Sequence, residues 1–446
     1  MYCHWRAHLH HSDWQASTGL NKQMRKIILR DRRNIFPFNE PARDLRVLNK
    51  PLWLYQRDML AHYATEEREV DSLAEIEDRR VETLVYRDNL FFDHFFLDEF
   101  IQRARKLGKA CRVAFALDDR AITAHAIYLQ RGIRREEDVY VADMWYFPHG
   151  VEPDVRPLVM DTEAREVGYY HVPTHMSDGK GDLVYQVPTK PFCSIEHWVH
   201  TITVNVIFGV FARGARLERD GEHSVGKQLR MLWRAMLERK QVLSSSEVVR
   251  IGRNCNIDPT AIIKGPTYIG DNVSIGPGAV VDVSIIGDNV DIAQGGQVQL
   301  SVVSDRCFLP FRAALFMSVM MEDSMVAQNT CLQFCSIGRN TFIGAGNTFT
   351  DFPLISKPIR TMCQGELGET GMPVLGGCVG HNCFVGSGLV VYPARAIESD
   401  VVLLASAERC VIDRNVCYED SDHFAIAGGE ELHPRMYPPG LSGLDV

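Results

Sequence analysis

The second half of the chain repeats a six-residue pattern in which an aliphatic residue opens each step. From Ile251 onward the steps read "IGRNCN", "IDPTAI", "IKGPTY", "IGDNVS" and "IGPGAV", and a small or branched residue usually occupies the fifth place. Glycine and other turn-forming residues favour a corner in each step, and the aliphatic side chain then points inward. Three steps close one turn, and the turns stack their aliphatic side chains on one another. The pattern predicts a three-sided parallel β-helix over residues 247–410.

The repeat breaks between Phe352 and Gly377, in "FPLISKPIRTMCQGELGETGMPVLGG". A long insertion in a solenoid usually forms a loop on one face, and that face is often the one that binds ligands. We therefore expect an inserted loop over residues 352–377 beside a binding surface.

Apolar runs in the first half alternate between strand-like and helix-like lengths. Residues 25–130 contain, in order, "KIIL", "PLWLYQRDMLAHYA", "ETLVYRD", "FFLDEFIQRARKLG" and "CRVAFAL", which predicts an α/β layer with largely parallel strands. After a mostly strand-like stretch, two helices over residues 194–214 and 224–240 lead into the β-helix. Asp88 lies at the carboxyl end of a strand, where it can hold Mg²⁺ on a polyphosphate. The alternative is that Asp88 caps the following helix.

Composition and charge narrow the classes of function. The 446 residues are 46% hydrophobic and 24% charged, and the net charge is -9, which argues against a general nucleic-acid binder. No apolar run approaches the roughly 18 residues that span a bilayer, and no export signal opens the chain. We therefore expect a cytoplasmic protein with neither a nucleic acid nor a membrane as partner.

The twelve cysteines lie mostly in apolar positions and match no zinc-ligand spacing. We expect buried free thiols in a reducing compartment. Residues 1–23 hold Cys3 and four histidines, a composition that also fits a metal-binding tail. The stretch "MRKIIL" from Met24 resembles a protein start, so we expect residues 1–23 to be a disordered extension.

The order of these pieces resembles the bifunctional UDP-N-acetylglucosamine pyrophosphorylase / glucosamine-1-phosphate N-acetyltransferase family, particularly its archaeal-type sugar-1-phosphate nucleotidylyltransferase members. The resemblance covers most of the chain and rests on "LRVLNKPLWLYQRDML", "YRDNLFF", "IEHWVHTITVNVIFG", "FIGAGNTFTDF" and "VGSGLVVYPARAI". It implies a nucleotidyltransferase-like (Rossmann-like) α/β domain followed by a left-handed parallel β-helix. It also implies a homotrimer and a sugar phosphate or nucleotide sugar as ligand.

The nucleotide site that this resemblance implies is degenerate. The family's "GGxGTRL" loop reads "RDRRNIF" here, and without glycines the backbone cannot approach a triphosphate closely. Arg30, Arg32 and Arg33 can still attract phosphates, as can Arg43 near the family's lysine position. Asp88 falls on the metal-binding aspartate, but no second carboxylate completes a Mg²⁺ site. We therefore expect nucleotidyl transfer to be lost.

The acetyltransferase site also departs from the family. Phe311, in "LPFRAALF", stands at the position of the catalytic histidine, and a phenyl ring cannot accept a proton. His381, in "VGHNCFVGSG", can replace that base if Asp351 orients it. The alternative is a solvent-exposed corner histidine that only makes a turn hydrogen bond.

Three more residues complete the acyltransferase site that the resemblance implies. Lys357 and Arg360 fall on the family's loop lysines and would bind a sugar phosphate or the phosphates of coenzyme A. Asn347 lies in the matching coil and joins them as a substrate or coenzyme A ligand. The implied acyl donor is acetyl-CoA.

The sequence leaves three functions open. The first is an acyl-CoA-dependent acyltransferase acting on a sugar or sugar phosphate, and the second is a non-catalytic sugar-nucleotide-binding or trimeric scaffold protein descended from such an enzyme. The third is a working nucleotidylyltransferase with an unusual loop. The predicted parts of the chain are an extension (1–23), a degenerate nucleotidyltransferase-like domain (24–220), a helical linker (221–246), the β-helix (247–410) and a C-terminal tail (411–446).

Overall fold

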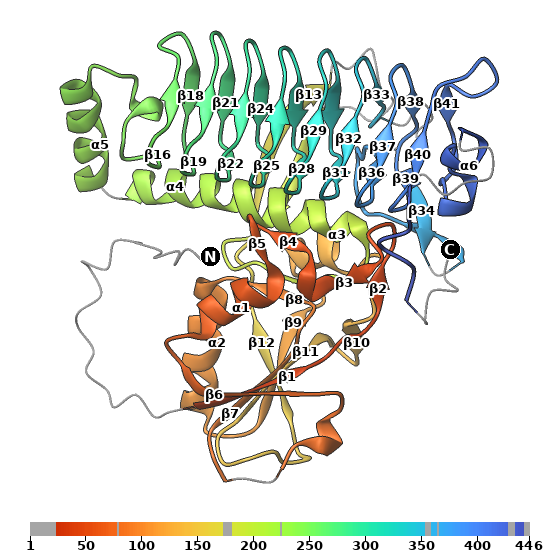
Figure 1. Ribbon diagram of the computed structural model, residues 1–446. Coiled ribbons are helices and arrows are strands. Elements are labelled where there is room, and N and C mark those ends of the chain that lie inside the picture. The colour runs from red at the N-terminus through yellow and green to blue at the C-terminus, as the bar shows by residue number, and fades with distance from the viewer. Residues whose placement is uncertain are drawn as a thin grey trace.

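The structure is a computed structural model that describes residues 24–77, 80–172, 181–223, 225–352, 358–363, 365–426 and 433–440. An α/β domain, red to yellow in Figure 1, lies against a prism of stacked β-coils, green to blue. Helices α3 (Trp198–Ile202) and α4 (Ala212–His223), joined by the π-helical segment η4 (Thr203–Phe211), run between the two parts. The predicted extension and Lys357 lie outside the described residues.

A seven-stranded sheet forms the centre of the α/β domain. Six strands follow the order β12-β9-β11-β7-β1-β6, and β10 pairs with β11. The strands are β1 (Met24–Leu29), β6 (Ala64–Val70), β7 (Thr83–Arg87), β9 (Cys111–Ala116), β10 (Ile133–Glu136), β11 (Val139–Phe147) and β12 (Arg156–Met160). Strand β1 is parallel to β6 and β7, and β9 is parallel to β12, but β11 is antiparallel to β7, β9 and β10. Over residues 25–130 the long strands β1, β6, β7 and β9 run in one direction, as predicted, and the antiparallel strands β10 and β11 follow that stretch.

The helices of this domain follow from local signals. Helix α1 (Leu52–Leu60) buries Leu52 and Leu60, and α2 (His94–Leu107) begins at an Asp93 cap and ends at Gly108. Gly108 has φ +63, a left-handed conformation that favours glycine at a helix end. The remaining short elements are β2 (Asn34–Ile35), β3 (Glu40–Pro41), η1 (Ala42–Asp44), β4 (Arg46–Val47), β5 (Lys50–Pro51), η2 (Leu73–Glu75), β8 (Leu90–Phe92), η3 (Ile122–Ala126) and β15 (Phe192–Ser194).

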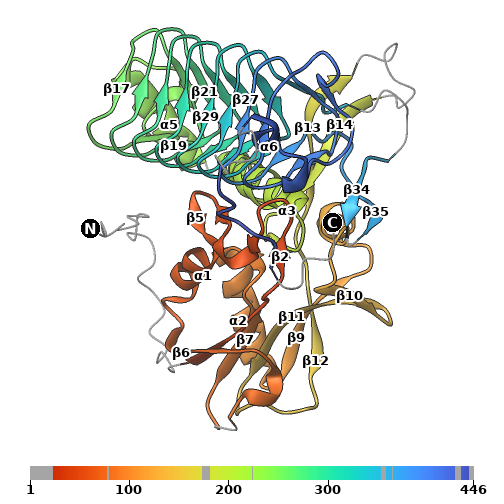
Figure 2. The same ribbon diagram turned by 45° about the vertical axis from the view of Figure 1, so that its right-hand side comes forward.

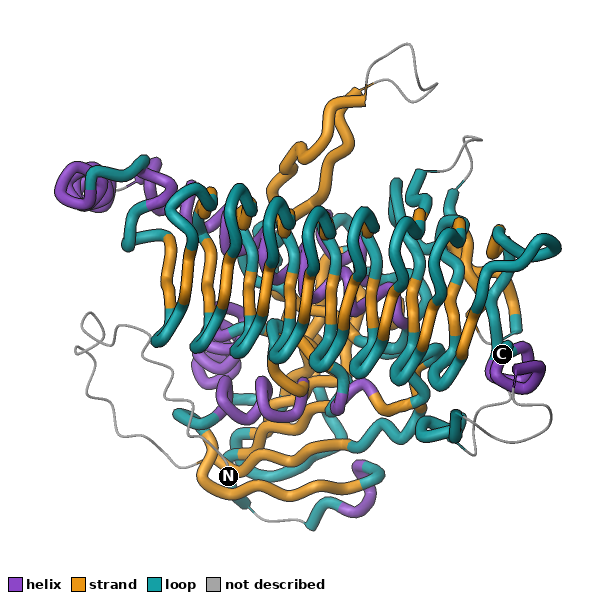
Figure 3. The backbone as a smooth tube through the Cα atoms, turned by 45° about the horizontal axis from the view of Figure 1, so that its top comes forward, coloured by secondary structure: helices purple, strands orange, loops and turns teal. Residues whose placement is uncertain are grey.

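Three parallel sheets of eight strands each form the prism, with successive coils stacked side by side (Figure 3). The first sheet contains β16 (Val249–Ile251), β19 (Thr267–Ile269), β22 (Ile285–Ile286), β25 (Val302–Val303), β28 (Val319–Met320), β31 (Ser336–Ile337), β36 (Cys378–Val379) and β39 (Ala396–Ile397). The second contains β17 (Asn256–Ile257), β20 (Ser274–Ile275), β23 (Asp291–Ile292), β26 (Phe308–Leu309), β29 (Met325–Val326), β32 (Phe342–Ile343), β37 (Phe384–Val385) and β40 (Val402–Leu403). The third contains β18 (Ile262–Lys264), β21 (Val280–Asp282), β24 (Gln297–Gln299), β27 (Ala314–Phe316), β30 (Cys331–Gln333), β33 (Thr348–Phe349), β38 (Val390–Val391) and β41 (Val411–Ile412).

The six-residue repeat accounts for the core of the prism. From Ile269 onward the aliphatic residue that opens each step is buried on the prism axis, as Ile275 and Ile343 are, whereas Ile251 of the first coil is exposed. This arrangement is consistent with the predicted left-handed β-helix. The eleven cysteines of the described residues are free thiols as expected, but only six are buried, and Cys331 and Cys410 are exposed. No helix in the described part of the chain has the length and apolar character that crossing a membrane requires.

The first sheet of the prism packs against the helical segment η4. Val210 of η4 contacts Ile285 and Val302 in a small buried cluster, so the outer face of this sheet is apolar as well as its inner face. Helix α5 (Val225–Glu238) continues past the first coil, at the left of Figure 1. The short segment η5 (Val242–Ser244) then leads into β16.

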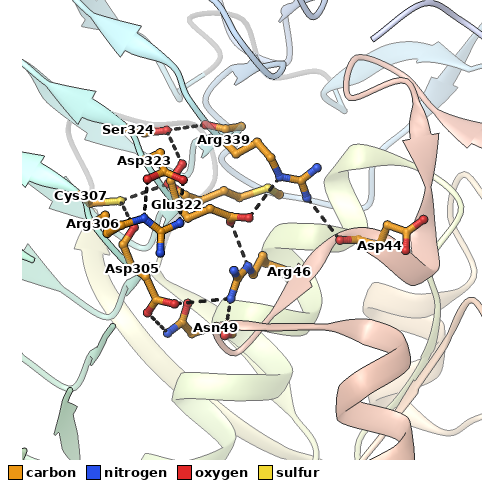
Figure 4. Close-up of polar contacts among 12 residues, drawn as sticks. Asp44, Arg46, Asn49, Asp305, Arg306, Cys307, Glu322, Asp323, Ser324 and Arg339 are labelled. Carbon is orange, nitrogen blue, oxygen red and sulfur yellow. Dashed lines mark hydrogen bonds and ion pairs between the residues drawn. The ribbon is translucent and has the colours of Figure 1, made fainter. Parts of the chain in front are cut away.

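Charged side chains at the corners of the prism bind residues 36–49 of the α/β domain (Figure 4). Arg46 lies between Glu322, at 2.9 Å, and Asp305, at 3.8 Å. Asn49 Nδ2 donates to Asp305 Oδ1 at 2.8 Å. These contacts join the α/β domain to the prism through side chains that the solenoid pattern places at its corners.

The predicted insertion leaves the prism after β33 and returns at β36. Its described part contains a hairpin of β34 (Arg360–Cys363) and β35 (Glu366–Glu369). A second hairpin, β13 (Arg165–Val172) with β14 (Gly181–Val187), lies on the same side of the molecule in Figure 2. The short segment η6 (Tyr418–Asp420) and α6 (His423–Ile426) follow the last coil.

Candidate functional site

The arginine-rich loop after β1 is paired with carboxylates of the same domain. Arg30 Nε donates to Glu69 Oε2 at 2.6 Å, and Arg32 Nη2 donates to Asp71 Oδ2 at 2.8 Å. Glu69 lies in strand β6, and Asp71 lies in the turn that follows it. Two of the cations proposed to attract a nucleotide are therefore engaged within the protein.

Arg33 lies between two buried carboxylates. Its Nε donates to Asp31 Oδ1 at 2.9 Å, and its Nη2 lies 3.0 Å from Glu196 Oε2. The hydrogen bond to Asp31 is the main reason that the pKa of Arg33 is raised, against the opposing effect of burial. Glu196 also accepts from the backbone N–H of Gly132 at 2.7 Å. This third cation of the loop is therefore paired within the protein as well.

Asp88 is buried at the end of β7, where the sequence placed it. Its Oδ1 accepts from the backbone N–H of Asp31 at 2.8 Å, and its Oδ2 accepts from Arg43 Nη1 at 3.3 Å. Burial raises the pKa of Asp88 to about 6, although these two donors oppose the rise. Arg43 also donates to Glu69 Oε1 at 3.0 Å. Side chains from four separate parts of the chain, Asp31, Arg43, Glu69 and Asp88, thus form one charge network.

Neither predicted role of Asp88 fits these contacts. The cap of α2 is Asp93, whose Oδ1 accepts from the Phe96 N–H at 3.0 Å, so the helix-cap alternative for Asp88 is wrong. Both oxygens of Asp88 already accept hydrogen bonds. Among the described residues, no group of three or more His, Cys, Asp and Glu side chains is arranged to hold a metal ion. The donor set therefore does not fit Mg²⁺.

A cavity of about 250 Å³ lies beside Asp88. Three cations and three carboxylates share its lining with Trp53, and these charged residues are Lys26, Arg43, Arg57, Glu67, Glu69 and Asp88. Lys26 lies within ion-pair distance of Glu67, at 2.5 Å. Lys26 and Arg43 are paired with anions and Arg57 lies over the Trp53 ring, so the lining favours a small neutral ligand over a triphosphate.

Asp88→Asn is expected to flatten the dependence of stability on pH. The folded pKa, about 6, lies above the ordinary value of 3.8, so the folded state binds more protons than the unfolded chain between these values. The free energy of unfolding should therefore fall by roughly 2–3 kcal/mol between pH 4 and 7 on account of this group. Urea titrations at both pH values measure the slope, with Asp71→Asn as an exposed control. An unchanged slope in Asp88→Asn would refute the assignment.

His381 lies at the corner between β36 and β37 and is fully buried. Its Nδ1 accepts from the Arg339 backbone N–H at 2.9 Å, and its Nε2 lies 3.1 Å from Glu40 Oε1. Its ring packs on Phe38 and Tyr437, with centroids 5.0 and 4.8 Å away. Burial is the main reason that its pKa is lowered. His381 thus makes a hydrogen bond at its corner, as the alternative to a catalytic role predicts, but it is not exposed to solvent as that alternative expects.

The predicted catalytic pair is not brought together. His381 stands at the corner between the first and second sheets, whereas Asp351 follows β33 of the third sheet. The Asp351 backbone carbonyl accepts from the Leu375 N–H at 2.9 Å, and burial raises the pKa of its carboxyl. His381 is buried in the described structure, and its contacts with Phe38 and Glu40 join the prism to the α/β domain.

Asn347 and Arg360 have different surroundings. Asn347 is buried and its amide joins two coils, because Nδ2 donates to the carbonyls of Gly344 and Gly386 and Oδ1 accepts from the Leu389 N–H. Arg360 is exposed on β34 and donates to Glu369 Oε1 of β35 at 3.2 Å. Arg360 can reach a ligand, whereas the polar atoms of Asn347 are already engaged.

A second cavity, the interdomain cavity, has a volume of about 490 Å³. It lies where the inserted loop meets the α/β domain, and its lining is mixed. The residues are Ala124, His125, Tyr128, Val184, Gln186, Pro358, Ile359, Glu369, Gly371, Met372 and Pro373. A Cβ on Gly371 would lie 2.3 Å from the Tyr128 ring, so this close approach of the loop requires glycine. Sequence reasoning missed the cavity because its two walls lie far apart in the chain.

His125 gives the interdomain cavity a neutral imidazole. Burial lowers its pKa to about 4. Its Nε2 accepts from the Gln186 backbone N–H at 3.1 Å, so the proton of the neutral ring is on Nδ1. The ring is therefore a fixed part of the cavity wall, since the lone pair that a base would use already accepts a hydrogen bond.

Comparison with known proteins supports the assignment of the prism. Residues 249–283 match the family described as bacterial transferase hexapeptide (six repeats). The matched residues cover β16 to β21, and the same parallel stacking continues to β41. Curated proteins give no match to the chain. The match and the stacked sheets support a hexapeptide-repeat β-helix of the transferase type.

Proposed function

We propose that the chain is an acyltransferase that moves an acyl group from a coenzyme A thioester to a sugar or sugar phosphate. The observation that carries the proposal is the interdomain cavity, which the insertion of a transferase-type β-helix forms against the α/β domain. Its volume, about 490 Å³, falls in the range of roughly 300–1,000 Å³ that is usual for small-molecule sites. Nucleotidyl transfer is absent from the proposal because Arg30, Arg32 and Arg33 are paired internally.

The lining of the interdomain cavity fits a sugar phosphate as acceptor. Glu369 is the one carboxylate among the described lining residues and can accept a hydrogen bond from an acceptor hydroxyl or amine. Arg360, its partner at 3.2 Å, is exposed and can pair with a phosphate. Tyr128 and Met372 offer flat and apolar surface to a sugar ring. In the transfer, the acceptor oxygen or nitrogen bonds to the acyl carbon as its C–S bond breaks, and the acceptor proton leaves to the thiolate or solvent.

Ligand-dependent thermal unfolding of the full chain tests this function. Acetyl-CoA and a sugar 1-phosphate, each at 100 times its dissociation constant, should stabilise the protein by about 2.7 kcal/mol. Ala124→Phe fills the interdomain cavity and should abolish the sugar phosphate shift, whereas Ala405→Phe on the exposed end of the prism should keep it. Light scattering on the same sample should give three times the chain mass of 50.4 kDa, which is the proposed homotrimer. Absence of a shift with either ligand would contradict the proposal.

A non-catalytic sugar-nucleotide-binding or scaffold protein is the second candidate. The placement of Arg33 between Asp31 and Glu196 favours it, because a cation that is paired within the protein is less able to hold the phosphates of a reacting nucleotide. The burial of His381 favours it too, since this imidazole docks two domains. Shifts with nucleotide sugars alone, without turnover of acetyl-CoA, would select this candidate.

A further inference from the structure

Helix α5 lies at the end of the prism (Figure 1), and it presents a large apolar face to solvent. Five large side chains on it are more than half exposed, namely Leu229, Leu232, Trp233, Met236 and Leu237. Their spacing of three and four residues places them on one side of the helix. Ala235, on another side, is buried. No described residue covers the exposed face, which is unusual for a soluble surface.

Cations border this apolar face. Arg230 and Arg234 lie beside it on the helix, and Glu247 is within 3.0 and 3.3 Å of them. Arg239 and Lys240 follow the end of the helix and are exposed. The one acid among these residues of the helix, Glu238, accepts hydrogen bonds from the backbone and hydroxyl of Ser246. The surroundings of the face are therefore cationic on a chain whose net charge is -9.

This charge distribution favours an anionic lipid surface over a second copy of α5 as the partner of the apolar face. Two copies of α5 that paired through the same face would bring Arg230, Arg234 and Arg239 toward the same cations of the other copy, which opposes association. An anionic lipid surface offers negative headgroups to the cations and an apolar layer to the leucines and Trp233. Tryptophan is enriched at that boundary because its ring is apolar and its N–H is polar.

We propose that α5 is an interfacial membrane-binding helix that lies in the headgroup layer of an anionic bilayer. Leu229, Trp233 and Met236 enter the acyl boundary, and the bordering cations contact phosphate groups. The sequence-based expectation of no membrane partner considered only segments that span a bilayer, and this helix lies along the surface. The proposal does not depend on the acyltransferase assignment.

Flotation of the full chain with vesicles tests the proposal. With vesicles of one part phosphatidylglycerol to three parts phosphatidylcholine in 50 mM NaCl, the bound fraction should exceed that on pure phosphatidylcholine about 10-fold. It should fall several-fold in 300 mM NaCl, because salt screens exposed charges. Equal binding to both vesicle types, or none to either, would overturn it.

Variants separate the lipid surface from a protein partner. Trp233→Glu/Met236→Glu should lower vesicle binding at least 10-fold, and the exposure of both side chains in the fold means that thermal unfolding should change little. Phe424→Glu/Ile426→Glu, on the exposed face of α6 at the other end of the prism, is the matched control and should bind as the unaltered chain does. A loss of oligomer mass in Trp233→Glu/Met236→Glu, with vesicle binding unchanged, would show instead that α5 is a contact between copies.

Discussion

Glu40→Ala is expected to lower the free energy of unfolding by about 3–5 kcal/mol, the usual cost of leaving buried charges without their partner. Glu40 Oε1 accepts from Arg339 Nη2 at 2.8 Å and lies 3.1 Å from His381 Nε2. Burial would raise the pKa of Glu40, but these two neighbours outweigh burial and lower it. The loss of unfolding free energy should lie near the lower end of this range, because Glu322 remains 3.2 Å from Arg339 in the variant.

Urea unfolding followed by circular dichroism at pH 7 measures this effect. Glu366→Ala, on the exposed hairpin of the insertion, is the control and should change stability by less than about 0.5 kcal/mol. The folded pKa of Glu40 lies below its unfolded value, so its contribution is present above about pH 4.5 and disappears as the pH falls through the folded pKa. The difference in unfolding free energy between the unaltered chain and Glu40→Ala should therefore become smaller in acid. A loss below about 1 kcal/mol at pH 7 would show that the prism and the α/β domain dock by other contacts.

The same cluster explains why the fold was easier to predict than its assembly. Each coil of the prism is a local pattern, so the sequence from Ile251 onward indicates where a side chain turns inward. His381 occupies a corner in that pattern, and corners of an isolated solenoid are exposed. Its burial comes from Phe38 and Glu40, which lie in the other domain. No periodicity within the solenoid carries that information.

Strand β6 shows a second limit of the hydrophobic pattern. Its sequence, "ATEEREV", contains four charged residues, and the helix before it was predicted to continue through Ala64. The strand forms because it lies at the edge of the sheet beside β1, where its carboxylates can reach solvent and the neighbouring arginines. The hydrophobic pattern does not predict this strand, so it does not place Glu69 beside Arg30 and Arg43. The ion pairs of these two arginines therefore could not be predicted from the sequence.

Asn347→Ala is expected to cost about 2–4 kcal/mol of stability, because it leaves buried polar groups without partners. Asn347 Nδ2 donates to the Gly344 and Gly386 carbonyls at 2.9 and 2.8 Å, and Oδ1 accepts from the Leu389 N–H at 2.7 Å. The side chain thus ties one coil of the prism to the next across a buried corner. Urea unfolding of the purified variant measures the loss.

Asn347→Asp should be worse than the alanine variant near neutral pH, since it places a buried carboxylate oxygen against two carbonyl oxygens. In acid the protonated carboxyl can donate to one of those carbonyls, so this variant alone should regain part of its stability between pH 8 and 5. Asn289→Asp is the matched control, because that exposed corner side chain accepts from Asn272 Nδ2 and an aspartate can still do so. If Asn347→Asp kept the stability of the unaltered chain but lost acetyl-CoA binding, Asn347 would be a ligand residue, as the family resemblance implies, and not a tie between coils.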